Sequence, residues 1–211
     1  DTTFPEDAND SIVKQLRTNV PEKLAHLLNV FERTRGLRDG EVPAEAGVCM
    51  CNGFVRGQAS EKEDVIVNFR LKDVEDVEFT VHTIGDLKQE NELLDRGSAI
   101  EANLKTVEGK TLRKGKLKLQ GLDAQEWLLT RKSEAVRLYG FTLEANSKIA
   151  SAKTPVLILD FLSGGRVAQP PLSPEQAVEL KPITKATLSE AESVALWDAV
   201  APTLRPRPGG F

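Results

Sequence analysis

The chain has 211 residues, and its 40% hydrophobic and 28% charged side chains are ordinary for a globular protein of one large or two small domains. This composition excludes a disordered chain, and no apolar stretch approaches the roughly 20 residues of a membrane-spanning helix. Residues 1–110 carry 22 acidic and 14 basic side chains, and the remainder carries 10 and 14. So small a basic surplus, with 5% aromatic residues, argues against nucleic-acid binding.

Two helices are predicted near the start of the chain. The first begins near Asp10 or Ser11 and ends before Pro21, because proline lacks the amide donor that a helix interior needs. The second runs from Pro21 to just before Gly36. Its apolar side chains recur three and four residues apart and predict a helix packed by one face: Leu24, Leu27, Leu28 and Phe31. We expect residues 1–40 to form an N-terminal helical segment.

Alternating apolar side chains predict strands from residue 48 onward. The first half of the chain should contain strands at 48–56, 64–71 and 77–82, and their short connections favour antiparallel pairing. Asp86 is then expected to cap a helix with an apolar stripe: Leu87, Leu93, Leu94, Ile100 and Leu104.

The second half again runs strands and then a helix. Strands are predicted at 111–120, 126–131, 136–144 and 156–162, followed by a long proline-rich connection. In the first of these, alternation places three ammonium groups on the solvent face: Lys114, Lys116 and Lys118. Ser189 and Glu192 have the spacing of a capping box. They should open a final helix with inward-facing Val194, Trp197, Val200 and Leu204.

The apolar run Val156 to Leu162 is interrupted only by Asp160, and it predicts a central strand covered on both faces. An unpaired carboxylate in such a strand would be costly. We therefore expect Asp160 either to face an edge or loop, or to pair with a buried cation such as Arg113 or Arg131.

Together these elements predict an α+β fold, in which helices pack on one or two mostly antiparallel sheets of about seven strands. Because both halves run strands and then a helix, a pseudo-duplicated arrangement is a second interpretation. Residues 41–211 are expected to form one compact domain. The only methionine is Met50, so we interpret the sequence as a processed form or a fragment.

No catalytic, cofactor-binding or metal-binding residues are predicted. The only histidines are His26, inside a predicted helix, and His82, on the polar side of a strand, and we interpret both as structural or solvated. Cys49 and Cys51 cannot supply four metal ligands, and no histidine cluster completes a site. We interpret them as buried thiols, with a strained disulfide or redox pair as the alternative.

Three charged residues stand beside apolar segments: Arg96, Arg113 and Glu126. A partly buried ion-pair network explains them, and an enzyme with an unfamiliar site, using Glu126 and Arg113, is the alternative. The absence of a familiar catalytic motif favours a binding protein over an enzyme. A small-ligand or lipid-binding module is a further possibility, and a deep apolar pocket would support it.

Five segments, in order, carry a resemblance to a known family: GVCMCNGFV, NELLDRGS, TLRKGKLKLQGLDAQEW, TPVLILDFLSGG and SEAESVALWDAVAPTLRPRPGGF. Over Glu41 to Phe211 the chain resembles the C-terminal domain of immunity proteins cognate to the fourth class of type VI secretion phospholipase effectors. It departs from the family pattern in having two cysteines and in placing Gln125 before the glutamate of GLDAQEW.

The resemblance implies a periplasmic bacterial protein whose partner is a cognate lipase effector. It implies inhibition by covering the lipase entrance or holding its lid, with no chemistry from the inhibitor. It also implies that the smaller N-terminal domain of the family is absent from this sequence. The sequence does not identify the partner-binding residues or the oligomeric state, and no cofactor is expected.

Overall fold

The structure is a computed structural model that describes residues 19–50, 52–58, 62–133, 136–165 and 183–207. The predicted first helix and most of the proline-rich connection lie outside these residues. The chain divides into two compact units, with the boundary between residues 58 and 59. In the described part of the chain, no helix is both long and apolar enough to cross a membrane.

The first unit contains one helix and a small antiparallel sheet in the order β1-β3-β2. Its elements are α2 (Val20–Arg33), β1 (Thr34–Gly36), β2 (Gly47–Met50) and β3 (Gly53–Arg56). Pro21 lies in the first turn of α2, where the missing amide proton costs no helical hydrogen bond.

Two expectations for this unit were wrong. Residues 48–56 do not form one strand, because the chain reverses between Met50 and Gly53, which pair with each other, and Asn52 has φ 39°. Asparagine tolerates this left-handed conformation better than most residues. The apolar face of α2 is also not packed against the described residues, since Leu24, Leu27, Leu28 and Phe31 are 49–65% exposed.

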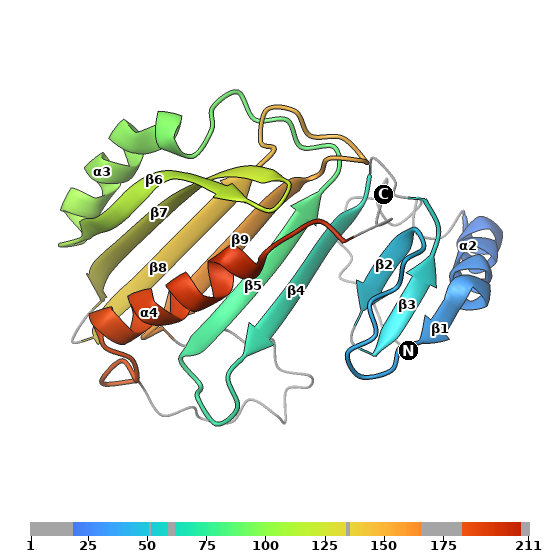
Figure 1. Ribbon diagram of the computed structural model, residues 1–211, viewed down its shortest axis with the longest axis horizontal. Coiled ribbons are helices and arrows are strands. Elements are labelled where there is room, and N and C mark those ends of the chain that lie inside the picture. Colours follow the sequence, from blue (N-terminus) through green and yellow to red (C-terminus); the bar gives the residue numbers. More distant parts are fainter. Residues whose placement is uncertain (1–18, 51, 59–61, 134–135, 166–182, 208–211) are drawn as a thin grey trace, which may run out of the picture. The chain divides into compact units, whose positions relative to one another are not determined.

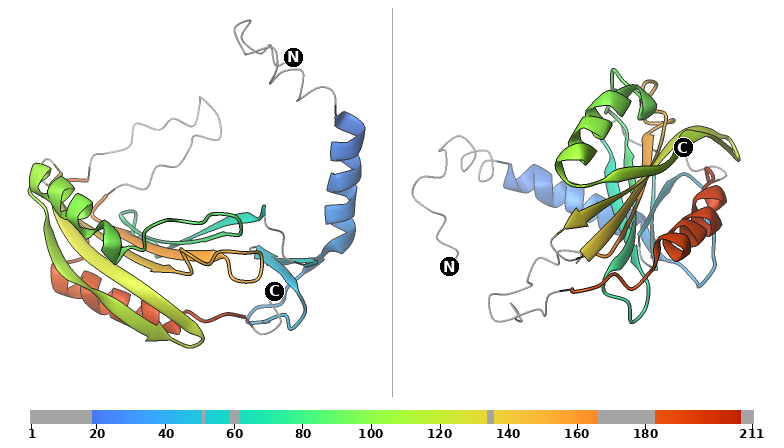
Figure 2. Two further views of the ribbon diagram at one scale, coloured as in Figure 1. Left: turned by 90° about the horizontal axis from the view of Figure 1, so that it is seen from above. Right: turned by 90° about the vertical axis from the view of Figure 1, so that its left-hand side faces the viewer.

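The second unit is built on a six-stranded antiparallel sheet in the order β4-β5-β9-β8-β7-β6 (Figure 1). Its strands are β4 (Asp64–Arg70), β5 (Val77–Ile84), β6 (Lys110–Leu119), β7 (Leu122–Ser133), β8 (Val136–Ala145) and β9 (Val156–Ser163). Its helices are η1 (Leu94–Arg96), α3 (Gly97–Thr106), α4 (Glu190–Val200) and η3 (Ala201–Thr203). Helices α4 and α3 lie on opposite faces of the sheet (Figures 1 and 2).

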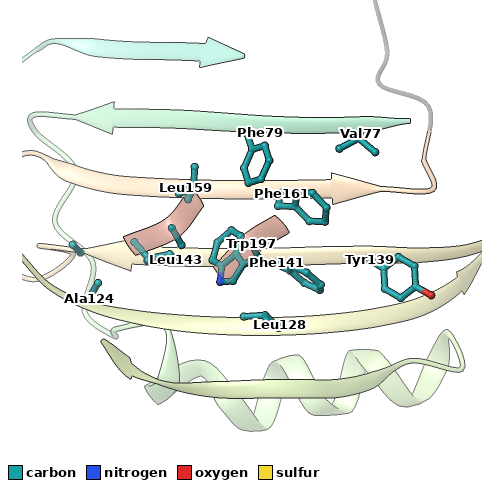
Figure 3. Close-up of a cluster of buried hydrophobic side chains, with 12 residues drawn as sticks. Val77, Phe79, Ala124, Leu128, Tyr139, Phe141, Leu143, Leu159, Phe161 and Trp197 are labelled. Atoms are coloured by element: carbon teal, nitrogen blue, oxygen red, sulfur yellow. The ribbon is translucent and has the colours of Figure 1, made fainter. Parts of the chain in front are cut away.

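The hydrophobic core lies between the sheet and α4. Phe141 stacks on Phe161 with ring centroids 5.0 Å apart and meets Trp197 of α4 edge-on at 5.8 Å. Around these three rings lie buried side chains from β5, β7, β8 and β9 (Figure 3). The predicted capping box is confirmed: the Ser189 hydroxyl accepts from the Glu192 amide, while the Glu192 carboxylate accepts from the Ser189 amide.

The helix predicted from Asp86 was wrong in its first half. Backbone amides between residues 89 and 94 donate to tertiary partners instead of to a helix. The Gln89 amide donates to the Ser147 carbonyl oxygen, and the Leu94 amide donates to the side chain of Gln125. Regular α-helix begins only at Gly97, where a small residue allows the chain to pass the Trp127 ring.

The α+β class and the mostly antiparallel pairing are confirmed. The described residues contain nine strands instead of about seven. The difference arises because residues 48–56 form two strands and because β1 was not predicted. Strands from both halves of the chain join in one sheet through the pairing of β5 with β9.

Candidate partner-binding surface

Two of the charged residues singled out by the sequence meet beneath α4. Glu126 of β7 is 3% exposed, and its carboxylate accepts from Arg113 Nε at 2.7 Å and from Trp197 Nε1 at 2.9 Å. Arg113 also donates to Asp198 of α4 at 2.5 Å. Hydrogen bonds from this guanidinium to Asp198 and Glu126 hold the pKa of Arg113 above its usual range. The cluster ties β6, β7 and α4 together.

Arg96 forms a second such pair, donating to Glu144, which also accepts from the Ser147 hydroxyl. The prediction of a partly buried ion-pair network is therefore confirmed for Arg96, Arg113 and Glu126. Each carboxylate is already held by at least two donors, so neither is placed as an available proton acceptor. These groups are part of the scaffold and supply no reactive centre.

The two histidines and the described cysteine lie on three different elements. His26 is exposed on α2, and His82 of β5 lies 2.6 Å from Asp64 of β4. Cys49 is exposed on β2, so the interpretation as a buried thiol was wrong for it, and Cys51 lies outside the described residues. Among the described residues, no three histidine, cysteine, aspartate or glutamate side chains gather as metal ligands.

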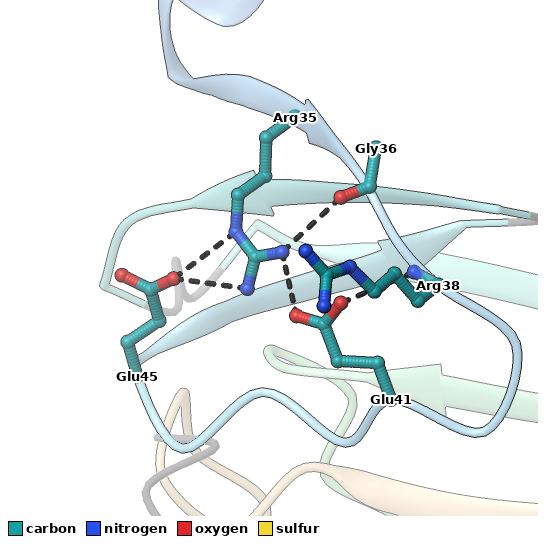
Figure 4. Close-up of polar contacts among 5 residues, drawn as sticks. All are labelled: Arg35, Gly36, Arg38, Glu41 and Glu45. Carbon is teal, nitrogen blue, oxygen red and sulfur yellow. Dashed lines mark hydrogen bonds and ion pairs between the residues drawn. The ribbon is translucent and has the colours of Figure 1, made fainter.

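The first unit contains an arginine cluster that the sequence did not reveal (Figure 4). Arg35 donates to Glu41 at 2.7 Å and to Glu45 at 3.3 Å, and it lies 5.1 Å from the Phe54 ring centroid. The Arg38 amide and Arg35 hold the pKa of Glu41 below its usual range. Because Arg35 and both acids lie close to solvent, this cluster orders the loop between β1 and β2 and contributes little to stability.

One sheet face in the second unit has the character of a binding surface. Along β9, Leu159 and Phe161, which face α4, are buried, whereas Ile158, Asp160 and Leu162 on the opposite face are only partly buried. The prediction that both faces of this strand are covered is therefore confirmed on the α4 side, and on the other side the described residues show only partial cover. We call this surface the open face, and it comprises Ile66, Asn68, Thr80, His82, Thr142, Ile158, Asp160 and Leu162.

A single row of side chains crosses the whole sheet on this side. The strand register aligns Asn68, Thr80, Asp160, Thr142, Trp127 and Lys114. At the β6 end, the Lys114 ammonium lies 4.3 Å from the Trp127 ring and 2.5 Å from Glu101 of α3. The three lysines of β6 were predicted to be solvated, but α3 thus engages the first of them. At the β4 end, the row is open.

Asp160 lies at the centre of this row. Its Oδ1 accepts from the Thr142 hydroxyl at 2.6 Å, and neither Arg113 nor Arg131 is its ion-pair partner. The other alternative, that Asp160 faces an edge or loop, was also wrong, because β9 is an interior strand and Asp160 lies on its face between Thr80 and Thr142. Burial raises the pKa of the Asp160 carboxyl, against the hydrogen bond from Thr142.

The sequence analysis did not identify the open face. Its signal was present in β9, where Ile158 and Leu162 share the parity of Asp160. In an antiparallel sheet with one solvated face, the outward positions are usually polar. Apolar side chains at these positions distinguish this face from an ordinary solvated one.

Comparisons with known proteins identify the family of the chain. The family described as Tle cognate immunity protein 4 C-terminal domain matches residues 41–209. No curated protein sequence matches the chain.

Two solved structures have a similar fold. Immunity protein TplEi of the T6SS from Pseudomonas aeruginosa, complexed with "L" peptide, is 23% identical with a TM-score of 0.65, covering 89% of this chain and 63% of that one. A chain of the Tle4–Tli4 complex is 21% identical with a TM-score of 0.66, covering 91% and 61%. The chain thus spans less than two thirds of these structures. Because the family match extends over most of its length, the chain belongs to the Tle cognate immunity protein 4 C-terminal domain family.

Proposed function

We propose that this chain is an immunity domain that binds a cognate type VI secretion phospholipase effector and inhibits it by binding alone. The observation that carries the proposal is the family match over residues 41–209. In this account, residues 41–211 act as the C-terminal domain of the family and residues 1–40 as a helical segment that precedes it. The proposed site of action is the bacterial periplasm, where a lipase would otherwise reach phospholipid.

The inhibitor contributes shape and charge instead of chemistry. Glu126, Arg113 and Arg96 are held in scaffold ion pairs and are not needed for a reaction. A stable protein complex buries about 1,600 Å² in total, with a few central residues supplying most of the affinity. Covering the entrance of the lipase, or holding its lid, would then keep phospholipid from the nucleophile.

A second candidate function, binding of a small amphiphilic anion, is favoured by one groove of about 330 Å³ in the second unit. Its wall includes apolar Val81, Leu157 and Leu204, and it also contains Lys153 and Arg205. An acyl chain with an acidic head would suit such a lining. This function would be supported over effector binding if lipid co-purified with the wild-type protein and did not co-purify with the Leu157→Gln variant.

The experiment for the leading proposal mixes the purified protein with the lipase encoded beside its gene. We expect a stable complex on gel filtration and loss of phospholipid hydrolysis at equimolar protein. Asp198→Asn serves as a control variant, because it changes only an exposed part of the scaffold cluster and should still inhibit. A protein that neither binds nor inhibits that lipase would refute the proposal.

A further inference from the structure

The open face contains an unusual carboxylate. Asp160 is partly buried, and the acids of the second unit that are at least nine-tenths buried all have strong donors inside the fold. Glu78, Glu126 and Glu144 each have an arginine partner, and Asp76 accepts from the backbone amides of Gly164 and Thr187. Asp160 has one neutral hydroxyl donor, Thr142, and among the described residues no cation lies within ion-pair distance.

The surroundings of Asp160 do not supply the missing charge. Glu144 on β8 repels its carboxylate, and His82 on β5 attracts it but is itself paired with Asp64. Arg70, at the edge of the same sheet, donates to Glu78 at 2.6 Å. A partly desolvated carboxylate without a counter-ion lowers the stability of the free protein. Residues that lower the stability of the free protein without a compensating interaction in its fold are characteristic of functional surfaces.

Apolar side chains flank the carboxylate along its own strand. Ile158 and Leu162 lie two residues to either side of Asp160 and share its face. Ile66 of the edge strand β4 is 57% exposed on that face. The arrangement is a central negative charge with apolar neighbours, which offers a basic side chain of a partner both an opposite charge and apolar surface.

We infer that the open face is the surface that binds the effector, and that a basic side chain of the effector, arginine or lysine, pairs with Asp160 between Ile158 and Leu162. This inference rests on the proposed function and identifies the chemistry of the partner. Charge complementarity identifies the central residue of the partner, because a cation would restore the favourable interactions that burial takes from the ionised carboxylate. Apolar effector residues around that cation would exclude water and strengthen the pair.

The test compares the dissociation constants of the wild-type protein and Asp160→Asn for the lipase encoded beside the gene. The amide keeps an acceptor for Thr142 and removes only the charge. We expect binding to weaken about 10- to 100-fold, as for loss of a hydrogen bond to a charged group. Glu190→Gln is the matched control: it removes a carboxylate from α4, on the opposite face, and should change binding less than about threefold.

Two further variants identify the partner residue and the apolar contacts. Asp160→Lys should abolish binding, and an effector in which the pairing basic residue is replaced by aspartate should restore it. Leu162→Thr introduces a β-branched residue that suits a strand while removing apolar surface, and it should weaken binding without unfolding the protein. Circular dichroism of each variant establishes that it is folded.

The outcomes separate this inference from the proposed function. Wild-type binding with equal affinity for Asp160→Asn would overturn the inference and leave effector binding intact. Absence of wild-type binding would overturn both. If a basic side chain of the same chain instead pairs with Asp160, Asp160→Asn should destabilise the free protein, and that result would also overturn the inference. The inference requires the free variant to be at least as stable as the wild-type protein.

Discussion

The cluster around Glu126 provides a quantitative test of what holds α4 on the sheet. Arg113 bonds to two carboxylates in different surroundings: the Glu126 side chain is 4% exposed, whereas that of Asp198 is 47% exposed. Replacing Arg113 by methionine preserves most of the aliphatic stem and removes the charge. Glu126 would then be buried with Trp197 Nε1 as its remaining donor in this cluster.

The magnitudes follow from this difference in burial. Removing one member of a buried ion pair costs about 3–5 kcal/mol, but the Arg113 side chain is 41% exposed, so water can partly replace it. We therefore expect Arg113→Met to lower the free energy of unfolding by about 2–4 kcal/mol. Asp198→Asn should cost only about 0.2–1 kcal/mol, as for an exposed pair.

Urea unfolding followed by circular dichroism measures both values. The double variant Arg113→Met/Glu126→Gln tests the cause, because the neutral amide at position 126 removes the uncompensated charge. It should be more stable than Arg113→Met alone. If Arg113→Met costs no more than Asp198→Asn, or if the two changes in the double variant are simply additive, the buried charge of Glu126 is not the reason for the loss.

Three further predictions concern single positions. Asp160→Asn should raise the free energy of unfolding at neutral pH, because burial raises the native pKa of this carboxyl. A raised native pKa gives stability at low pH that is lost as pH rises through it. The stability advantage of the variant, measured by urea unfolding from neutral to acidic pH, should therefore shrink as pH falls. Ser189→Ala removes the capping hydroxyl of α4 and should cost about 1 kcal/mol in the same assay, with Ser189→Asp nearly neutral. Gly164→Ala should lower the thermal midpoint strongly and the free energy of unfolding by about 2 kcal/mol or more. The reason is that φ is +86° and the new Cβ would lie 2.5 Å from the Arg137 carbonyl oxygen. Gly115→Ala is the control, because its new Cβ meets no neighbour within 4 Å.

Most strands of the second unit could be predicted because their signals are local. Alternation of apolar side chains located β4 and β5, and the spacing of Ser189 and Glu192 located the start of α4. The reversal between Met50 and Gly53 has a weaker signal, since Asn52 takes a left-handed conformation without a neighbouring proline. The irregular stretch before α3 could not be read locally, because distant Ser147 and Gln125 accept the backbone amides of Gln89 and Leu94.

The surface was harder to predict than the scaffold. Because buried charges need partners, the sequence could predict that Arg113 and Arg96 pair with acids. It could not predict that Asp198 is the third member of the Arg113 cluster. For Asp160, the rule that a buried carboxylate has a cation led to the wrong partners. An apolar run reads the same whether its second face is covered by its own chain or by another protein, so β9 did not reveal which of its faces is open.

The most direct test of the central claim is a titration of lipase activity. The lipase encoded beside the gene is held at a fixed concentration with phospholipid vesicles, and the purified protein is added up to and beyond equimolar amounts. We predict that hydrolysis falls in proportion to added protein and stops near one equivalent, while Asp160→Asn requires more protein for the same effect. Undiminished hydrolysis in the presence of excess wild-type protein would contradict the account.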